Sequence, residues 1–457
     1  MAYMRTLNYK IDTIKVEIGD GVNNGLPLFD VKETEATDMQ NLDSRKYPAM
    51  HVRTPRKDYT TALTTIRHLG RRKNDYLIVV DDTVWKYWNG AWVNILTGLT
   101  AADAESIDFM DKTILVNGTD AKYWDGSTSG NVTGMPASHF VTVHANRIYA
   151  ANKTNQNLNF SALRKYNDWT TANDSGQVVV ETRDGEFCSG LTAFANHVMY
   201  FKEHSIHELY GTGPYNYSMQ VLSNEYGCIS HRSIKEVDGK LLWLSYKGVY
   251  LYTGGTAPQL ISTPWVKGYI DRLDITNRAK ACAGTDGIRY YLCLPIDSGA
   301  RILLVYDTVA QQWHVEDSIN IVEFTEMNNI LYGSTGAQIK NMVDSTGTEA
   351  ISWYRIWRPD IDGSLSMKKE WDSIYFLCSL PSGSTLNCYL SNDAEGENWT
   401  LVKSFTAQTN IQNVEVDIPL TIGQGVDYAR IKLSGTGPCT VFAMEKRLRV
   451  QKGSYNG

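Results

Sequence analysis

Tyr76-Leu-Ile-Val-Val, followed by Asp-Asp-Thr and then Val84-Trp-Lys-Tyr-Trp88, reads as two short apolar strands joined by a tight polar turn. The same unit returns as Thr113-Ile-Leu-Val, Asn117-Gly-Thr-Asp and Ala121-Lys-Tyr-Trp124. Its Asn-Gly pair favours a hairpin with a primed turn. The chain is therefore predicted to be built from repeated antiparallel hairpins.

The hairpins recur at a regular spacing. Copies begin near residues 76, 113, 147, 197, 240, 289 and 329, an average interval of roughly 42 residues, which is the length of one four-stranded propeller blade. A unit of this size cannot bury its own apolar face, so such units stack radially. The spacing predicts a six- or seven-bladed β-propeller over residues 61–345.

The pattern changes after a turn-rich linker at Asp344-Ser-Thr-Gly-Thr-Glu349. Six alternating strands follow within about a hundred residues, separated by Gly, Pro, Asn and Asp, which favours a β-sandwich of jelly-roll type over 351–457. Residues 1–60 carry no repeat and are predicted to form an arm or a strand that helps to close the ring. Helical periodicity is weak, with one short helix expected at Trp265–Leu273. The expected fold class is all-β.

Composition limits the cellular setting of the chain. Its 457 residues are 42% hydrophobic and 21% charged, and no stretch has the length of a membrane-spanning helix. The start of the sequence lacks the pattern of a secretory signal. The seven cysteines are odd in number and lie mostly among apolar strand residues, which is typical of buried free thiols made in a reducing cytoplasm.

Positive charge is concentrated in one segment. The formal net charge is −6, yet residues 45–73 carry nine basic side chains against the single acid Asp58. A basic band on an acidic body can meet a nucleic acid or an acidic partner, although solvated basic loops are equally common. These side chains form the predicted partner interface: Arg45, Lys46, Arg53, Arg56, Lys57, Arg67, Arg71, Arg72 and Lys73.

No motif in the sequence predicts catalysis. His204, His207 and Glu208 resemble a zinc-binding set, but the histidines are three residues apart on an expected strand, where they point to opposite faces. The stretch from Ser391 to Trp399 resembles an Asp-box turn, a hairpin feature remote from catalysis. We expect no enzyme activity, no catalytic residues, no metal and no cofactor.

Several motifs resemble phage tail-ring proteins. These are Gly21-Val-Asn-Asn-Gly-Leu-Pro-Leu-Phe, the acidic step from Glu33 to Leu42, and Arg53-Thr-Pro-Arg56, after which Lys57-Asp58 departs from the Pro-Gly turn of that family. The likeness continues through Ser205-Ile-His-Glu-Leu-Tyr-Gly-Thr-Gly-Pro and Leu242-Trp-Leu-Ser-Tyr-Lys-Gly-Val-Tyr-Leu-Tyr. Together they resemble the tail hub or nozzle family of short-tailed phages, of the packaged-DNA stabilisation type.

This resemblance implies a virion protein made in the host cytoplasm. It implies a homo-oligomeric ring, of six copies, below the portal and adaptor, which retains the genomic DNA and conducts it without sequence-specific binding. The basic segment is then expected to face a partner protein and not the channel, because basic residues in the channel would grip phosphates.

Two other functions fit the same fold. One is a glycan-binding or glycan-hydrolysing tail protein for host attachment, because exposed aromatic loops can stack on sugars. The aromatic residues in question are also suited to packing between blades; they are Trp85, Tyr87, Trp88, Trp92, Tyr123 and Trp124. The other alternative is a cellular propeller scaffold that presents loops to peptides.

Overall fold

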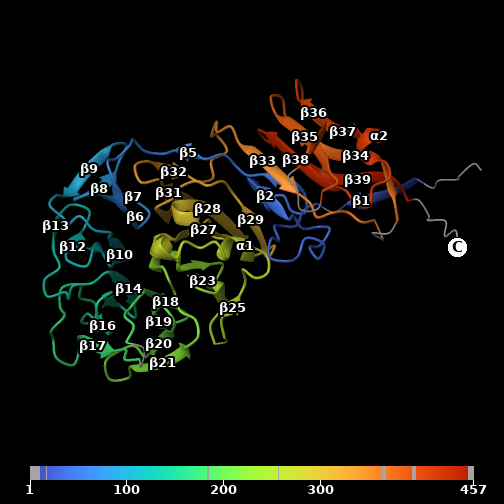
Figure 1. The fold of residues 1–457 in the computed structure, drawn as a ribbon. Helices are drawn as coiled ribbons and strands as arrows, with labels where there is room; N and C mark the ends of the chain where they lie inside the picture. Colours follow the sequence, from blue (N-terminus) through green and yellow to red (C-terminus); the bar gives the residue numbers. More distant parts are fainter. Residues whose placement is uncertain are drawn as a thin grey trace, which may run out of the picture.

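A computed structural model of the chain describes residues 11–16, 18–182, 185–255, 257–362, 367–393 and 398–450. The fold over these residues is all-β, with 39 strands and a few single-turn helices. Two β bodies lie side by side (Figure 1), a larger one coloured from blue to yellow-orange and a smaller one mostly in orange and red, with blue strands of the N-terminal segment. No helix in the described ranges is both long and apolar enough to cross a membrane.

The larger body contains seven four-stranded antiparallel sheets among the described residues. In the first three the strands are β6 Ile66–Arg72, β7 Tyr76–Asp81, β8 Val84–Trp88, β9 Trp92–Leu96; β10 Glu105–Phe109, β11 Lys112–Val116, β12 Ala121–Trp124, β13 Ser129–Asn131; β14 Phe140–His144, β15 Arg147–Ala151, β16 Asn157–Phe160 and β17 Gly176–Val179. The next two sheets are β18 Gly190–Phe194, β19 His197–Phe201, β20 Ile206–Tyr210, β21 Ser218–Ser223; and β22 Lys235–Val237, β23 Lys240–Ser245, β24 Gly248–Tyr252, β25 Gln259–Leu260.

The last two sheets of this body come from residues 282–341 and one strand of the N-terminal segment. They consist of β26 Cys282–Thr285, β27 Arg289–Ile296, β28 Ala300–Asp307, β29 Gln312–Val315; and β30 Glu323–Met327, β31 Ile330–Ser334, β32 Ile339–Asn341, β5 Lys57–Asp58. Single-turn helices join some strands: the 3₁₀ turns η1 His231–Ser233, η2 Ile275–Lys280 and η3 Asp297–Gly299, and α1 Lys267–Ile270.

These sheets form a closed ring, a β-propeller. Their first strands contact one another in sequence order: β6 contacts β10, β10 contacts β14, β14 contacts β18, β18 contacts η1 just before β22, β22 contacts β26, β26 contacts β30, and β30 contacts β6. A separate apolar cluster fills the space between each neighbouring pair of sheets, including the pair formed by the first sheet and the last. Each sheet therefore buries its two faces against its neighbours.

The smaller body consists of a six-stranded and a five-stranded sheet. The six-stranded sheet contains β3 Leu42–Asp43, β4 Met50–Val52, β39 Thr440–Val450, β34 Lys369–Leu380 and β37 Ile411–Asp417, with β1 Ile11–Val16 also on β39. The five-stranded sheet contains β2 Asp38–Gln40, β33 Ser352–Ile356, β38 Arg430–Thr436, β35 Thr385–Ser391 and β36 Thr400–Thr406. One turn of helix, α2 Leu420–Gly423, packs on β34.

The N-terminal segment belongs to both bodies. Its strands β1, β3 and β4 join the six-stranded sheet, β2 joins the five-stranded sheet, and β5 pairs with β32 as the fourth strand of the last propeller sheet. Residues 11–58 therefore connect three sheets whose other strands come from residues 323–450.

Candidate functional site

The propeller encloses a polar cavity of about 870 Å³ on its axis. The inner strands of the ring supply its walls, with His68 from β6, Glu105 from β10, Phe140 from β14, Lys235 from β22 and Glu323 from β30. The alternation of side chains along each inner strand sends some residues towards the axis and others into the clusters between sheets. Charged groups from widely separated parts of the sequence therefore meet at one place.

The segment around η1 crosses this axis. His231 Nε2 lies 2.7 Å from Glu105 Oε1 on β10, 126 residues earlier in the chain. Arg232 donates to the Arg67 carbonyl of β6 at 2.7 Å and lies 3.4 Å from Glu323. We call His231–Lys235 the axial plug, because it joins the inner strands of sheets that are not its neighbours in the ring.

Glu323 is the most strongly held carboxylate of the cavity. It accepts a backbone hydrogen bond from Leu69 at 2.7 Å, and both its oxygens lie 3.2 Å from His68 Nδ1. Burial, which raises the pKa, is outweighed by the charges of Arg232 and His68 and by these hydrogen bonds, which lower the pKa of Glu323 to about 2. Glu323, on β30, is thus an ionised carboxylate that binds both β6 and η1.

Two ammonium groups of the cavity have no such anchor. Within the described residues, neither Lys153 nor Lys235 makes a side-chain hydrogen bond or ion pair; Lys153 lies over the Phe140 ring, 5.2 Å from its centroid. Burial lowers the pKa of Lys235, while Glu323 and Glu105 oppose that effect. These two ammonium groups are the ones left to meet water or a polar ligand in the cavity.

The three residues that resemble a zinc-binding set in the sequence, His204, His207 and Glu208, do not converge on one point. His204 binds Glu186, His207 lies 3.1 Å from Ser205 Oγ, and Glu208 accepts from the hydroxyls of Tyr210 and Tyr252 at 2.9 and 2.8 Å. His204 and His207 therefore have separate partners.

A different group, Glu186, Glu203 and His204, has its ligand atoms within 4.8 Å of one another. Glu203, however, already accepts from Arg278 Nε at 2.8 Å and from the Tyr246 hydroxyl. Its negative charge is therefore balanced within the chain, and the group has the composition of an ion-pair cluster.

The predicted basic segment divides into buried and exposed members. Arg53 and Arg56 are buried, with side chains 2% and 3% exposed. Arg53 donates to Asp317 at 2.9 Å and to Glu349 at 2.8 and 2.9 Å, and Arg56 donates to Glu316 at 2.5 Å and to Asp317 at 2.7 Å. We call this set the arginine clamp, because it ties the N-terminal segment to the end of the propeller and to the linker.

The other basic residues have mixed surroundings. Arg72 is buried and donates to the backbone carbonyls of Asp111 and Asp125, while Arg45 and Arg67 are half-buried and pair with Asp43 and Asp82. The members exposed to solvent are Lys46, Lys57, Arg71 and Lys73. Only these four side chains are fully available to a partner, and that partner interface stays a prediction.

The aromatic residues considered as sugar platforms pack against one another. Trp85 is fully buried, and the Tyr87 and Trp124 rings lie 4.9 Å apart between the first two propeller sheets. Trp88 and Trp92 form an edge-to-face pair at 5.1 Å on neighbouring strands. Their contacts are those of blade packing.

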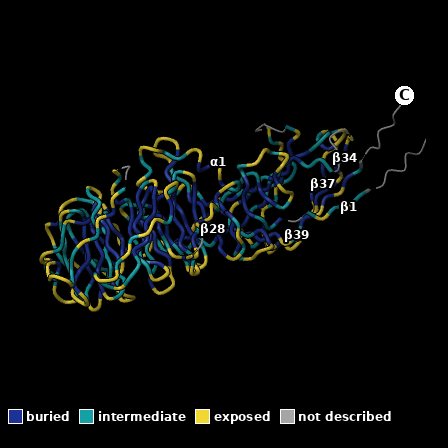
Figure 2. The backbone as a smooth tube through the Cα atoms, turned by 90° about the horizontal axis from the view of Figure 1, so that it is seen from below, coloured by how far each residue is buried: buried dark blue, intermediate teal, exposed yellow. Residues whose placement is uncertain are grey.

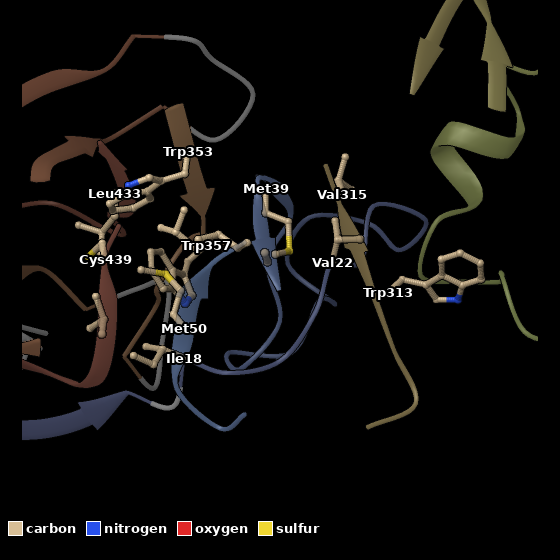
Figure 3. Close-up of a cluster of buried hydrophobic side chains, with 14 of the residues drawn as sticks. Ile18, Val22, Met39, Met50, Trp313, Val315, Trp353, Trp357, Leu433 and Cys439 are labelled. Carbon is tan, nitrogen blue, oxygen red and sulfur yellow. The ribbon is translucent and has the colours of Figure 1, made fainter. Parts of the chain in front are cut away.

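A continuous apolar core joins the propeller to the smaller body. Figure 3 shows Trp313 and Val315 on the propeller side, Met39 of the N-terminal segment in the middle, and Trp353 and Leu433 on the far side. The tube view agrees, because buried backbone continues from one body into the other (Figure 2). The two bodies are therefore packed as one unit.

Arg355 strengthens this junction. It is 1% exposed on β33 and donates to the carbonyls of Asp20 and Thr34, both at 2.7 Å. Burial lowers the pKa of its guanidinium to about 9, although the charge stays in place at neutral pH. The hydrogen bonds hold the N-terminal segment against the five-stranded sheet.

No protein-family model and no curated protein matches the sequence. Solved structures with a similar course of the chain include streptogramin B lyase, at 10% identity and a TM-score of 0.45 over 63% of this chain and 96% of that one. YCF48 bound to D1 peptide matches at 10% identity and a TM-score of 0.43, over 68% of this chain and 100% of that one. The BP39L lectin from Burkholderia pseudomallei matches at 12% identity and a TM-score of 0.43, over 64% of this chain and 98% of that one. These likenesses assign no activity to the chain.

Proposed function

We propose that this chain is a structural protein of a phage tail, a subunit of the hub or nozzle ring that retains and then conducts the genome. In this proposal the seven four-stranded sheets are the blades of a seven-bladed propeller, and the two C-terminal sheets form a β-sandwich. The protein is made in the host cytoplasm, carried in the virion, and contacts the portal, the adaptor or other tail proteins.

The observation that carries the proposal is the apolar core shared by both bodies. Domains joined by a small polar interface move relative to each other, whereas a large apolar interface holds them together. Here Val22, Met39 and Met50 fill the junction, and the arginine clamp closes its edge with buried ion pairs. A tail protein that works by its shape and transmits load requires a rigid, elongated subunit.

The propeller axis is not the proposed path of the DNA. The axial plug fills part of that axis and joins opposite inner strands through Glu105 and Glu323. The genome would instead pass through the opening between copies of the chain. With a net charge of −6, the chain is repulsive to phosphates unless its exposed basic residues face the opening.

Electron microscopy of the purified full-length protein, alone and mixed with portal and adaptor proteins, tests this proposal. We expect closed rings with the exposed lysines Lys46 and Lys57 away from the central opening. Mass spectrometry of purified virus particles is the companion measurement. A protein that stays a single propeller in every mixture and is absent from virus particles contradicts the proposal.

The axial cavity favours a second candidate, the binding of a polar ligand such as a glycan. Its volume suits a small ligand, and Lys153 and Lys235 offer two donors without a carboxylate partner among the described residues. Titration with a panel of neutral and acidic oligosaccharides separates the two functions, because affinity lost in Lys235→Met and kept in Lys280→Met supports a ligand site. If no sugar in the panel binds, the ligand-binding candidate is contradicted and only the structural proposal remains.

A further inference from the structure

Two cysteines face each other across neighbouring strands of one propeller sheet. Cys282 on β26 and Cys293 on β27 are register partners in an antiparallel ladder, and both are fully buried and unbonded. Opposite residues in such a ladder have Cα atoms about 4.5–5.5 Å apart, within the range of about 4.4–6.8 Å found in disulfides. Their side chains point to the same face of the sheet.

The surroundings of the two thiols place the sulfur atoms together. Cys282 Sγ donates to the Ile321 carbonyl at 3.3 Å, and Cys293 Sγ donates to the Ile319 carbonyl at 3.6 Å. Both sulfurs therefore converge on one short segment that leads into β30. Both cysteines also belong to the same apolar cluster between this sheet and the next.

A guanidinium group is in direct contact with the sulfur of Cys293. Arg301 Nη1 is 3.9 Å from Cys293 Sγ and is held there by its hydrogen bond to the Ile321 carbonyl at 2.7 Å. The neighbouring Cys282 side chain and the charge of Arg301 lower the pKa of Cys293, while burial raises that of Cys282. Cys293 is thus suited to be the attacking thiolate and Cys282 the resolving thiol.

The other five cysteines lack this arrangement. In the described strand pairs, Cys388 lies opposite Leu433 and Lys403, and Cys378 lies opposite Val441. No other described strand pair sets one cysteine directly opposite another. The pair is therefore distinguished by geometry and not only by burial.

We propose that Cys282 and Cys293 form a dithiol that closes to a cross-strand disulfide when the protein meets hydrogen peroxide. The Cys293 thiolate attacks one peroxide oxygen, the O–O bond breaks, and the departing hydroxide takes up the proton released by Cys293 to leave as water. The resulting sulfenic acid is attacked by Cys282, and its hydroxyl leaves with the Cys282 proton as a second water. Two thiols are oxidised while one peroxide is reduced to two waters.

The bond would stiffen the wall of the axial cavity. β26 is an inner strand that contacts η1, the start of the axial plug, so a link to β27 restrains the strand on which the plug rests. Hydrogen peroxide is small and uncharged, and brief local opening of the sheet lets it reach the sulfurs. This inference holds whether or not the chain is a tail protein.

Peptide mapping of the full-length protein tests the proposal. After treatment with hydrogen peroxide, alkylation in denaturant and trypsin digestion without reductant, we expect residues 281–289 and 290–301 as one linked species. Free thiols counted after unfolding fall from seven to five. Arg301→Gln slows this loss about fivefold, because it raises the fraction of Cys293 present as the unreactive thiol.

Matched variants keep the outcome unambiguous. Cys282→Ser and Cys293→Ser abolish the linked species, whereas Cys388→Ser, another buried cysteine, leaves its yield unchanged. The proposal is overturned if all seven thiols survive at peroxide exposures that oxidise a model dithiol. It is equally overturned if the linked species forms at the same rate as random pairs among the other cysteines, with the circular dichroism still native.

Discussion

Glu323 is a buried charge whose partners come from other parts of the chain. Its carboxylate is held by His68 and the Leu69 amide of β6 and by Arg232 of η1, two segments far apart in the sequence. Removing one member of such a group leaves the others as uncompensated charges, which costs more than the pair contributes. The axial network therefore ties β6, β30 and η1 together at the cavity wall.

Glu323→Gln is expected to lower the free energy of unfolding at pH 7 by about 3 kcal/mol, because Arg232 and His68 lose their shared carboxylate. The folded pKa of about 2 lies below the ordinary 4.5, so the stabilisation is fully present above pH 4.5 and is lost as the pH falls towards 2. Urea unfolding at pH 7, 4 and 2.5 checks this. We expect the difference in the free energy of unfolding between Glu323→Gln and the wild type to shrink as the pH falls. The control Glu236→Gln, at an exposed residue, is expected to match the wild type at every pH.

The hairpins predicted from the sequence are the second and third strands of every propeller sheet. Val84–Trp88 and Ala121–Trp124 match the observed β8 and β12 residue for residue. The second strands of these sheets, β7 and β11, are almost wholly buried, so their apolar residues are continuous and easily seen. The expected helix at 265–273 is also present, as the single turn α1.

The first and fourth strands were missed for physical reasons. The inner strands carry charged residues such as Glu105 and Glu323, which face the axis and break the apolar pattern. The outer strands are short and exposed, and β25 has only two residues. The cavity could not be predicted either, because each inner strand contributes one or two residues from a different part of the chain.

The ion pairs of the basic segment were equally hidden in the sequence. Arg53 and Arg56 find their carboxylates about 260 to 300 residues later, at Asp317 and Glu349. Composition showed the excess of positive charge but not which members are buried. The sequence suggested an arm or a strand that helps to close the ring, but not the bounds or partners of β1 to β5, because pairing with distant sheets, and not local propensity, makes them strands.

A substitution at Tyr59 tests whether the pairing of β5 with β32 holds the last propeller sheet together. The Tyr59 amide donates to the Ile339 carbonyl at 2.9 Å, and its ring lies 4.7 Å from that of Tyr332. Tyr59→Pro removes the amide donor and the ring, whereas Tyr59→Ala removes only the ring. We expect faster hydrogen exchange in β5 and β32 for the proline variant than for the alanine variant. Equal exchange in both would show that the backbone bond does not hold the closure.

The molecule as a whole is expected to unfold as one unit. Two bodies that share an apolar core lose it together, whereas bodies joined by a flexible linker melt separately. In the chain, the shared core includes Met39, which is 1% exposed and lies between the propeller and the five-stranded sheet.

Met39→Asn is therefore expected to split the single calorimetric transition of the wild type into two. The amide would be buried without a partner at the junction, at a cost of about 2–4 kcal/mol, while the cores inside each body stay intact. Differential scanning calorimetry checks this, with Met110→Asn, at a residue 55% exposed, as the control. A single transition in the Met39 variant would mean that the bodies are coupled by other contacts.

The early place of residues 11–58 in the sequence also determines when the protein can finish folding during its synthesis. A ribosome makes this segment first, yet its strands complete sheets whose remaining strands, β30 to β39, emerge last. Until translation ends, the early segment has no native partner, so a nascent chain that stops short leaves both the ring and the C-terminal sheets unfinished. Only chains that include β30 to β39 can complete these sheets, so products truncated before these strands cannot reach the native fold.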